Sequence, residues 1–205
     1  MITLLIIAAL FAVAVFIFMQ QPQFGKAPSG ERLERIQKSP HYKKGQFDNL
    51  SFTPQLAEDA SMTKVMFRFL FGKNGHAKPQ QNFKFTKTNL KNLNPNQNIY
   101  VWMGHSSYFI QIDGKKILVD PVFSGNASPV SFTTKAFDGA DLYSAEDIPE
   151  LDYLIISHDH WDHLDYETVK KLHPKVKQVI TELGTGEHLE YLNYDPKKII
   201  ELDWG

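Results

Sequence analysis

Three histidines and two interleaved aspartates fall within residues 158–163. The apolar run at residues 153–156 comes directly before them and is typical of a short strand buried on both faces. Side chains two residues apart in an extended segment project to the same side, so His158 and His160 can converge on one ion. If the chain then turns into a helix, Asp162 and the histidine after it face a second ion close by. The pattern predicts a metal centre at the mouth of a buried strand, with a polar surface loop as the alternative.

The sequence contains no cysteine, which excludes disulfides, thiolate metal ligands and a cysteine nucleophile. A site built from imidazole and carboxylate suits zinc, iron or manganese, and zinc is the commonest fit. Two such ions about 3.5–4 Å apart can hold a bridging hydroxide at neutral pH, which is a hydrolytic nucleophile. The predicted centre is therefore suited to hydrolysis.

Strands that alternate with helices in the C-terminal half predict an α/β architecture. Two β-rich runs around Asp113-Gly114 form a strong hairpin signal. The predicted strands cover residues 99–102, 108–112, 116–119, 153–156, 176–181 and 199–202, and the predicted helices cover residues 166–172 and 187–193.

Residues 2–19 are uncharged and almost wholly apolar. At about 1.5 Å per residue they form a helix of roughly 27 Å, close to the ~30 Å hydrocarbon core of a bilayer. A cleaved signal peptide is the alternative, but such peptides usually begin with basic residues and this one does not. A retained anchor is favoured. Basic residues follow it, so the positive-inside rule places the rest of the chain on the cytoplasmic side.

The chain between this anchor and residue 98 is less regular. Residues 20–55 carry four prolines and scattered charge with little periodicity, which favours a tether. Residues 65–71 are strongly apolar within a basic stretch, and two interpretations stay open: a core element, or an interfacial element lying on anionic lipid. The predicted organisation is an anchor at 1–19, a tether and basic, apolar extension at 20–97, and the metal-binding α/β part of the chain at 98–205.

The run at residues 158–163 resembles the HxHxDH signature of the metallo-β-lactamase superfamily. Further blocks resemble the branch that contains N-acyl-phosphatidylethanolamine-hydrolysing phospholipase D and its bacterial relatives. These blocks are residues 45–49, 102–107, 118–123, 127–129, 163–166 and 201–204. The resemblance covers about residues 40–205.

The resemblance implies a ligand set for two zinc ions. His158 and His160 are expected on one zinc, and Asp162 and His163 on the other. The family's domain is an αββα sandwich of two similar halves, and only the first half is expected in this chain. A later histidine for each zinc and a bridging carboxylate would lie in the second half, so the chain is expected to be a fragment or an inactive truncated product.

Two further residues are candidates for the catalytic site. Asp120 matches the superfamily's first acidic position and is expected to support the ligands by hydrogen bonding, with an ordinary Asp-Pro turn as the alternative. His105 follows a glycine between strands and either approaches the same region or is a buried, hydrogen-bonded histidine. Asp165 is expected at a helix start. The remaining histidines are expected to be solvated: His41, His76, His173 and His188.

The function implied by the resemblance is a zinc-dependent phosphodiesterase of the phospholipase D type. It would act on phospholipid at a membrane, the inner membrane of a bacterium, through a metal-bridging hydroxide. A lactonase, a soluble phosphodiesterase and an inactive membrane-tethered remnant are the alternatives. The net charge is −1. A nucleic-acid partner is disfavoured because the basic stretch adjoins an apolar run and the motif-bearing half is acidic.

Overall fold

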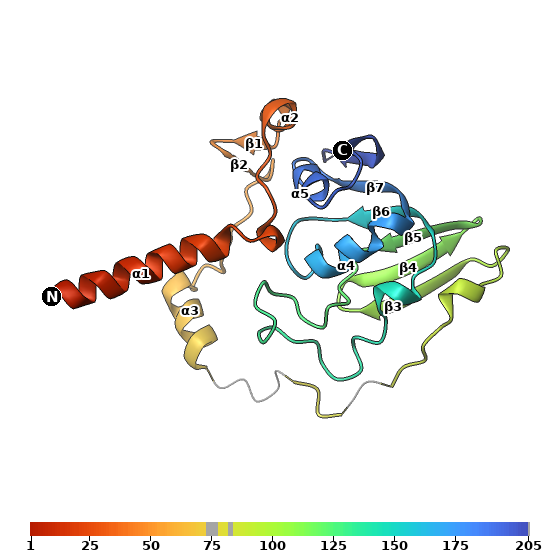
Figure 1. Cartoon of the computed structure of the whole chain (residues 1–205), viewed down its shortest axis with the longest axis horizontal. Coiled ribbons are helices and arrows are strands. Elements are labelled where there is room, and N and C mark those ends of the chain that lie inside the picture. The colour runs from red at the N-terminus through yellow and green to blue at the C-terminus, as the bar shows by residue number, and fades with distance from the viewer. Residues whose placement is uncertain (73–77, 82–83, 205) are drawn as a thin grey trace.

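The computed structural model describes residues 1–72, 78–81 and 84–204. A six-stranded sheet with strand order β3-β4-β5-β6-β7-β8 forms its centre (Figure 1). The first three strands are antiparallel and the last four pair in parallel. The strands are β3 (Ile99–Gly104), β4 (Ser107–Ile112), β5 (Lys115–Val119), β6 (Leu151–Ile156), β7 (Val176–Glu182) and β8 (Ile199–Leu202).

Local sequence explains how these strands are joined. The predicted hairpin at Asp113-Gly114 is confirmed, and both residues have a positive φ, as a two-residue hairpin turn of the primed type requires. Parallel neighbours need a crossover connection. Helix α4 (Tyr166–Leu172) joins β6 to β7, and α5 (Gly186–Tyr191) joins β7 to β8. The predicted mixed α/β fold class is therefore confirmed.

The two faces of the sheet differ in burial. Phe109, Leu118, Leu154 and Val179 are paired across β4 to β7 and are fully buried. They share a core cluster with residues of α4 and α5, including Val169, Leu172 and Leu189. The next row of paired residues lies on the opposite face, where Tyr100 is 61% exposed and its neighbours in β4, β5 and β6 are half-buried. The core therefore lies on the helix-covered face.

Helix α1 (Ile2–Met19) has no buried residue and projects away from the sheet (Figure 1). Its length and its mean hydropathy of 3.0 are enough to cross a membrane. Helix α3 (Met62–Phe71) also buries none of its residues. The core interpretation of residues 65–71 is therefore wrong for the part of the chain that the structure describes, because no other element covers these side chains.

Residues 20–55, predicted as a tether, contain several short elements. The segment forms η1 (Pro22–Phe24), α2 (Gly30–Lys38) and a small hairpin of β1 (Tyr42–Lys43) and β2 (Gln46–Phe47). Ile36 of α2 is buried, and Arg32 of α2 forms ion pairs with α5 and β8. These long-range contacts, which local composition cannot reveal, order the segment.

Candidate metal centre

A tight loop between β6 and α4 carries the histidine run. The backbone N–H groups of His163 and Leu164 both donate to the carbonyl of His160, which folds the chain back on itself. As a result the rings of His158 and His163 approach to 3.9 Å between centroids, and those of His158 and His160 to 4.7 Å. The predicted turn from strand to helix thus brings the side chains of the motif together.

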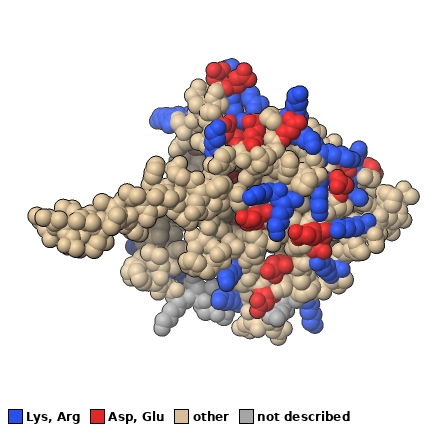
Figure 2. Space-filling view, viewed as in Figure 1, with Lys and Arg blue, Asp and Glu red and all other residues tan. Residues whose placement is uncertain are grey.

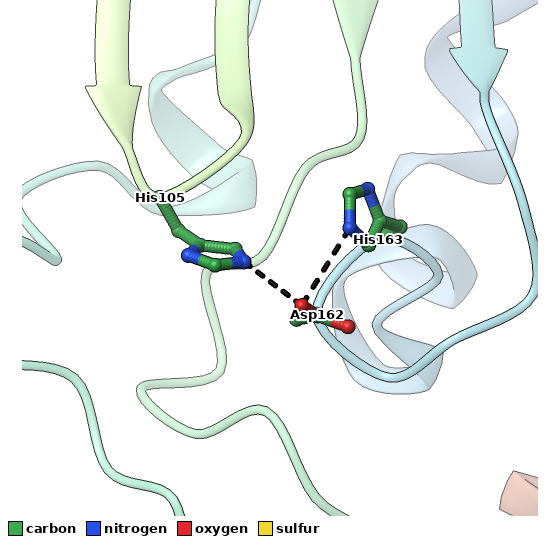
Figure 3. Close-up of side chains that lie close together, drawn as sticks. All are labelled: His105, Asp162 and His163. Carbon is green, nitrogen blue, oxygen red and sulfur yellow. Dashed lines mark hydrogen bonds and ion pairs between the residues drawn. The ribbon is translucent and has the colours of Figure 1, made fainter. Parts of the chain in front are cut away.

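Two groups of three side chains offer ligand atoms that all lie within 4.8 Å of one another. One group is His158, His160 and Asp162, and the other is His105, Asp162 and His163. Asp162 belongs to both groups. In Figure 3 its carboxylate lies between His105, from the turn after β3, and His163, from the loop after β6. One carboxylate is therefore within reach of two possible metal positions.

Asp120 supports His163 from behind. It is buried directly after β5, and its Oδ2 lies 2.8 Å from Nδ1 of His163. The N–H and the hydroxyl of Ser157 also donate to this carboxylate, each at 2.7 Å. Asp120 adopts a positive φ of 43°, a conformation that an ordinary residue rarely takes. The contact with Nδ1 leaves Nε2 of His163 free to face an ion, which is how carboxylates commonly orient ligand histidines.

His105 lies in the turn between β3 and β4. Its Nε2 is 2.9 Å from Oδ2 of Asp162, and its side chain is 62% exposed. The buried interpretation of His105 is therefore wrong. Gly104 before it has a φ of +110°, and a Cβ there would lie 2.1 Å from the carbonyl oxygen of Ala140. The glycine thus lets the turn lie close to the loop at residues 120–142.

The pKa values of two side chains in the loop are shifted toward the protonation states that bind metal ions. Burial and the neighbouring imidazoles of His163 and His160 lower the pKa of His158 and favour its neutral form. Burial alone would raise the pKa of Asp162, but the hydrogen bond with His105 and nearby positive charge outweigh it and lower that pKa. A neutral imidazole and an ionised carboxylate are the forms that bind metal.

The structure brings together the four side chains predicted as ligands, but in a different grouping. The sequence paired Asp162 with His163 alone, whereas the structure places Asp162 within reach of His158 and His160 as well. It also adds His105 to the His163 group. Asp162 lies close to His158 and His160 because the loop folds back tightly at His160, and His105 joins His163 from the turn between β3 and β4. Sequence spacing alone shows neither contact.

The predictions for the other candidate residues have mixed outcomes. Asp165 does precede α4, and its carboxylate accepts from the N–H groups of Phe123 and Ser124. The expectation of solvated histidines is wrong for three residues, which are half-buried and contact other residues: His41, His173 and His188. His76 lies outside the described residues.

A cavity of about 590 Å³ lies beside the candidate metal centre. His105 and Asp162 form part of its wall, and the long loop between β5 and β6 supplies much of the rest. The lining is largely apolar and includes Trp102, Val122 and Phe137. Its volume falls within the range of small-molecule sites, roughly 300–1,000 Å³.

Comparison with known proteins gives matches over the same region. The family model described as "Beta-lactamase superfamily domain" matches residues 100–200. An uncharacterized protein of Mycobacterium tuberculosis is 29% identical over 169 residues, which are 82% of this chain and 45% of that protein. The chain thus spans less than half of the length of this relative. N-acyl-phosphatidylethanolamine-hydrolyzing phospholipase D 1 of Caenorhabditis elegans is 33% identical over 110 residues, 51% of this chain and 31% of that protein. A UPF0173 metal-dependent hydrolase of Caldivirga maquilingensis is 32% identical over 63 residues, 31% of this chain and 22% of that protein.

Proposed function

Because residues 100–200 belong to the metallo-β-lactamase superfamily, we propose that the protein is a metal-dependent phosphodiesterase that cleaves a membrane phospholipid. The observation that carries this proposal is the position of Asp162, which lies within ligand distance of two separate histidine groups. The named activity of the relative from Caenorhabditis elegans supports an N-acyl-phosphatidylethanolamine-like substrate.

The donor set fits a pair of zinc ions. It consists of imidazole nitrogens and a carboxylate, without sulfur, and iron or manganese is compatible with the same atoms. When bound, two such ions activate water at neutral pH and neutralise the negative charge that develops on a phosphoryl group. His158, His160, Asp162 and His163 hold the ions in this proposal. Asp120 keeps His163 oriented through its Nδ1.

The surroundings of the centre support a lipid substrate. Apolar side chains line the cavity next to His105 and Asp162, so it can accept an apolar portion of the substrate. Helix α1 can hold the protein at a bilayer, and α3 exposes Phe67, Phe69 and Phe71 next to basic residues. Both helices would keep the centre near its substrate. In this proposal the protein is membrane-associated, and its cytoplasmic orientation stays a prediction from the charge distribution.

The proposal is tested with the purified full-length protein loaded with Zn²⁺ and vesicles that contain N-acyl-phosphatidylethanolamine. We expect release of N-acylethanolamine, and loss of at least a hundredfold in rate for Asp162→Asn. Intact vesicle lipid together with cleavage of a lactone or a soluble phosphodiester would replace this substrate assignment by one of the alternatives. Less than one tightly held zinc per chain would favour the inactive remnant.

Deletion of residues 2–19 further distinguishes an enzyme that cleaves phospholipid from one that acts on a soluble substrate. A lipid enzyme loses most of its activity on vesicles while it keeps activity on a short-chain, soluble analogue. A lactonase or soluble phosphodiesterase keeps both activities. The deletion stops before residue 20 because α2 is in contact with the domain.

A further inference from the structure

We infer that the N-terminal arm, residues 20–38, clasps the metal-binding loop, residues 157–165, through His188, so that arm docking and metal binding strengthen each other. This inference goes beyond the proposed function. It depends on the metal centre and on no particular substrate. Three sets of contacts carry it: ion pairs that hold the arm, a histidine that connects arm and loop, and an aromatic contact made directly on the loop.

Ion pairs hold the arm against α5 and β8. The guanidinium of Arg32 lies 2.9 Å from Glu187, 2.5 Å from Glu190 and 2.9 Å from Glu201. The side chain of Glu201 is only 1% exposed, and it also accepts from the N–H groups of Gly184 and Gly186. Removal of the arm would leave this buried carboxylate without its Arg32 partner, a costly state. The arm therefore has a defined docking site on the domain.

His188 connects the arm to the loop. The backbone N–H of Lys26 donates to Nδ1 of His188 at 2.7 Å, which places the ring proton on Nε2. Nε2 lies 3.5 Å from Oδ2 of Asp159, a residue of the metal-binding loop. One imidazole thus contacts arm backbone with one nitrogen and faces the loop with the other.

The arm also touches the loop directly, because Phe24 packs edge-on against Trp161 at 5.7 Å between ring centroids. The two loop residues that face this side, Asp159 and Trp161, alternate along the chain with the candidate ligands at positions 158, 160 and 162. The side chains at 158, 160 and 162 form one candidate metal-binding group. Those of Asp159 and Trp161 contact His188 and the arm, respectively. A displaced arm would leave one side of the loop without support, and so disturb the ligand positions.

Such a connection is reciprocal by thermodynamic linkage. If the docked arm strengthens Zn²⁺ binding by a given factor, Zn²⁺ must strengthen arm docking by the same factor. Loss of an outer partner of a metal ligand typically costs ~10–100-fold in affinity. For His188, which acts through Asp159 as a positioning residue, we expect about tenfold.

Gly25 provides the variant that separates the arm from His188. It has a φ of +68°, and a Cβ there would lie 1.7 Å from Nδ1 of His188, so Gly25→Ala must displace one of them. Gly30→Ala is the matched control, since Gly30 lies in the same arm with a φ of +53° and has no atom within 4 Å of such a Cβ. We expect Gly25→Ala to weaken Zn²⁺ binding about tenfold and Gly30→Ala to change it less than twofold. Zn²⁺ affinity is measured by competition with a chelator, and thermal unfolding shows that both variants remain folded.

A second experiment tests the effect of Zn²⁺ on arm docking and measures hydrogen exchange in residues 20–38 with and without Zn²⁺. We expect Zn²⁺ to slow exchange in the wild type and in Gly30→Ala, but not in His188→Ala. His173→Ala, which removes another half-buried histidine, should behave as the wild type. The inference is overturned if Gly25→Ala binds Zn²⁺ as tightly as its control, or if Zn²⁺ leaves arm exchange unchanged. Neither measurement uses a substrate. If the proposed phosphodiesterase activity is absent, Zn²⁺ affinity and hydrogen exchange can therefore still support or overturn this inference.

Discussion

Helices α1 and α2 lie close together in the chain and are held in opposite ways. Helix α1 is apolar on all sides, and none of its residues is buried within the part of the chain that the structure describes. Helix α2 is rich in charge, yet it buries Ile36 and places Arg32 among three glutamates of the domain. Figure 2 shows the contrast on the surface, where the projecting α1 carries no charged side chain. Apolar character here marks the helix that the domain leaves uncovered.

The difference follows from what each surface can find as a partner. A helix that is hydrophobic all round is stable only when something apolar surrounds it. The described residues provide no such cover for α1, whereas a bilayer does. The charges of α2 have specific partners on α5 and β8, and such partners can hold a short helix that isolated propensity would not. The two helices should therefore respond differently to the same kind of change.

The largest expected effect is on α1. Ala9→Arg places a charge near the centre of the apolar run, where insertion costs about 2.5–3.5 kcal/mol. We expect vesicle association to fall about a hundredfold in a sedimentation assay. Unfolding of the sheet domain should keep the same midpoint, because α1 buries nothing on it. Ala60→Arg, at an exposed position outside α1, is the control. Equal vesicle binding by both variants would contradict the role assigned to α1.

A change in α2 should have the reverse signature. Arg32→Ala removes the hydrogen bonds to Glu187 and Glu190 and leaves Glu201 less well paired. A hydrogen bond to a charged group contributes about 1.5–3 kcal/mol. Glu190 is partly exposed, which reduces the contribution of its bond, so we expect a total loss of roughly 2 kcal/mol in urea unfolding. Vesicle association should not change. Arg68→Ala on the exposed α3 should alter the free energy of unfolding by less than ~0.5 kcal/mol.

Helix α3 tests whether exposed apolar side chains other than those of α1 meet lipid. Phe69 is 79% exposed, and its full burial in an apolar phase is worth about 1.5–3 kcal/mol. We expect Phe69→Ser to weaken binding to anionic vesicles roughly tenfold. Phe52→Ser changes a phenylalanine outside α3 that is even more exposed, at 93%, and should have no effect. Similar losses in both variants would show that α3 has no special role.

The smallest expected effect is the pH dependence of the α2 contact. Burial pushes the pKa of Glu187 upward, but hydrogen bonds and charge from Arg32 and Lys26 outweigh it and lower that pKa below its usual 4.5. A lowered folded-state pKa means that the stabilisation is present above pH 4.5 and is lost as the pH falls through the lower value. Hydrogen exchange in the arm should therefore rise as the pH falls below 4.5, after correction for intrinsic rates. In Glu187→Gln this rise should be smaller. Helix α1 has no titratable side chain and should show no such change.

Much of the fold could be predicted because its signals are local. The helix at residues 166–172 and the hairpin at Asp113-Gly114 have the predicted bounds or lie within one or two residues of them. The predicted ligands also converge, since one strand end and one tight loop suffice to bring them together. The roles of Asp120 and His105 in catalysis stay predictions, although the structure places both against the predicted ligands.

One error concerns a residue whose partner is far away in sequence. His188 was expected in solvent, but its Nδ1 accepts from the backbone of Lys26, which is 162 residues earlier. A backbone donor leaves no signal in side-chain composition. Residues 20–55 were predicted as a tether from their prolines and scattered charge. The acidic partners of Arg32 in this segment lie more than 150 residues later, so local composition carries no sign of them.

By itself, the sequence determined the six strands of the central sheet, the helices α4 and α5 that connect them, the apolar character of α1 and the side chains available to bind metal. These properties follow from residue type and from spacings of a few residues, which covalent geometry converts directly into direction. Only the tertiary structure decided that Asp162 serves two groups, that His105 joins one of them, and that the arm meets the opposite side of the loop. Those facts depend on distances of a few ångströms between distant segments, and such distances are set by how the sheet and its loops pack together.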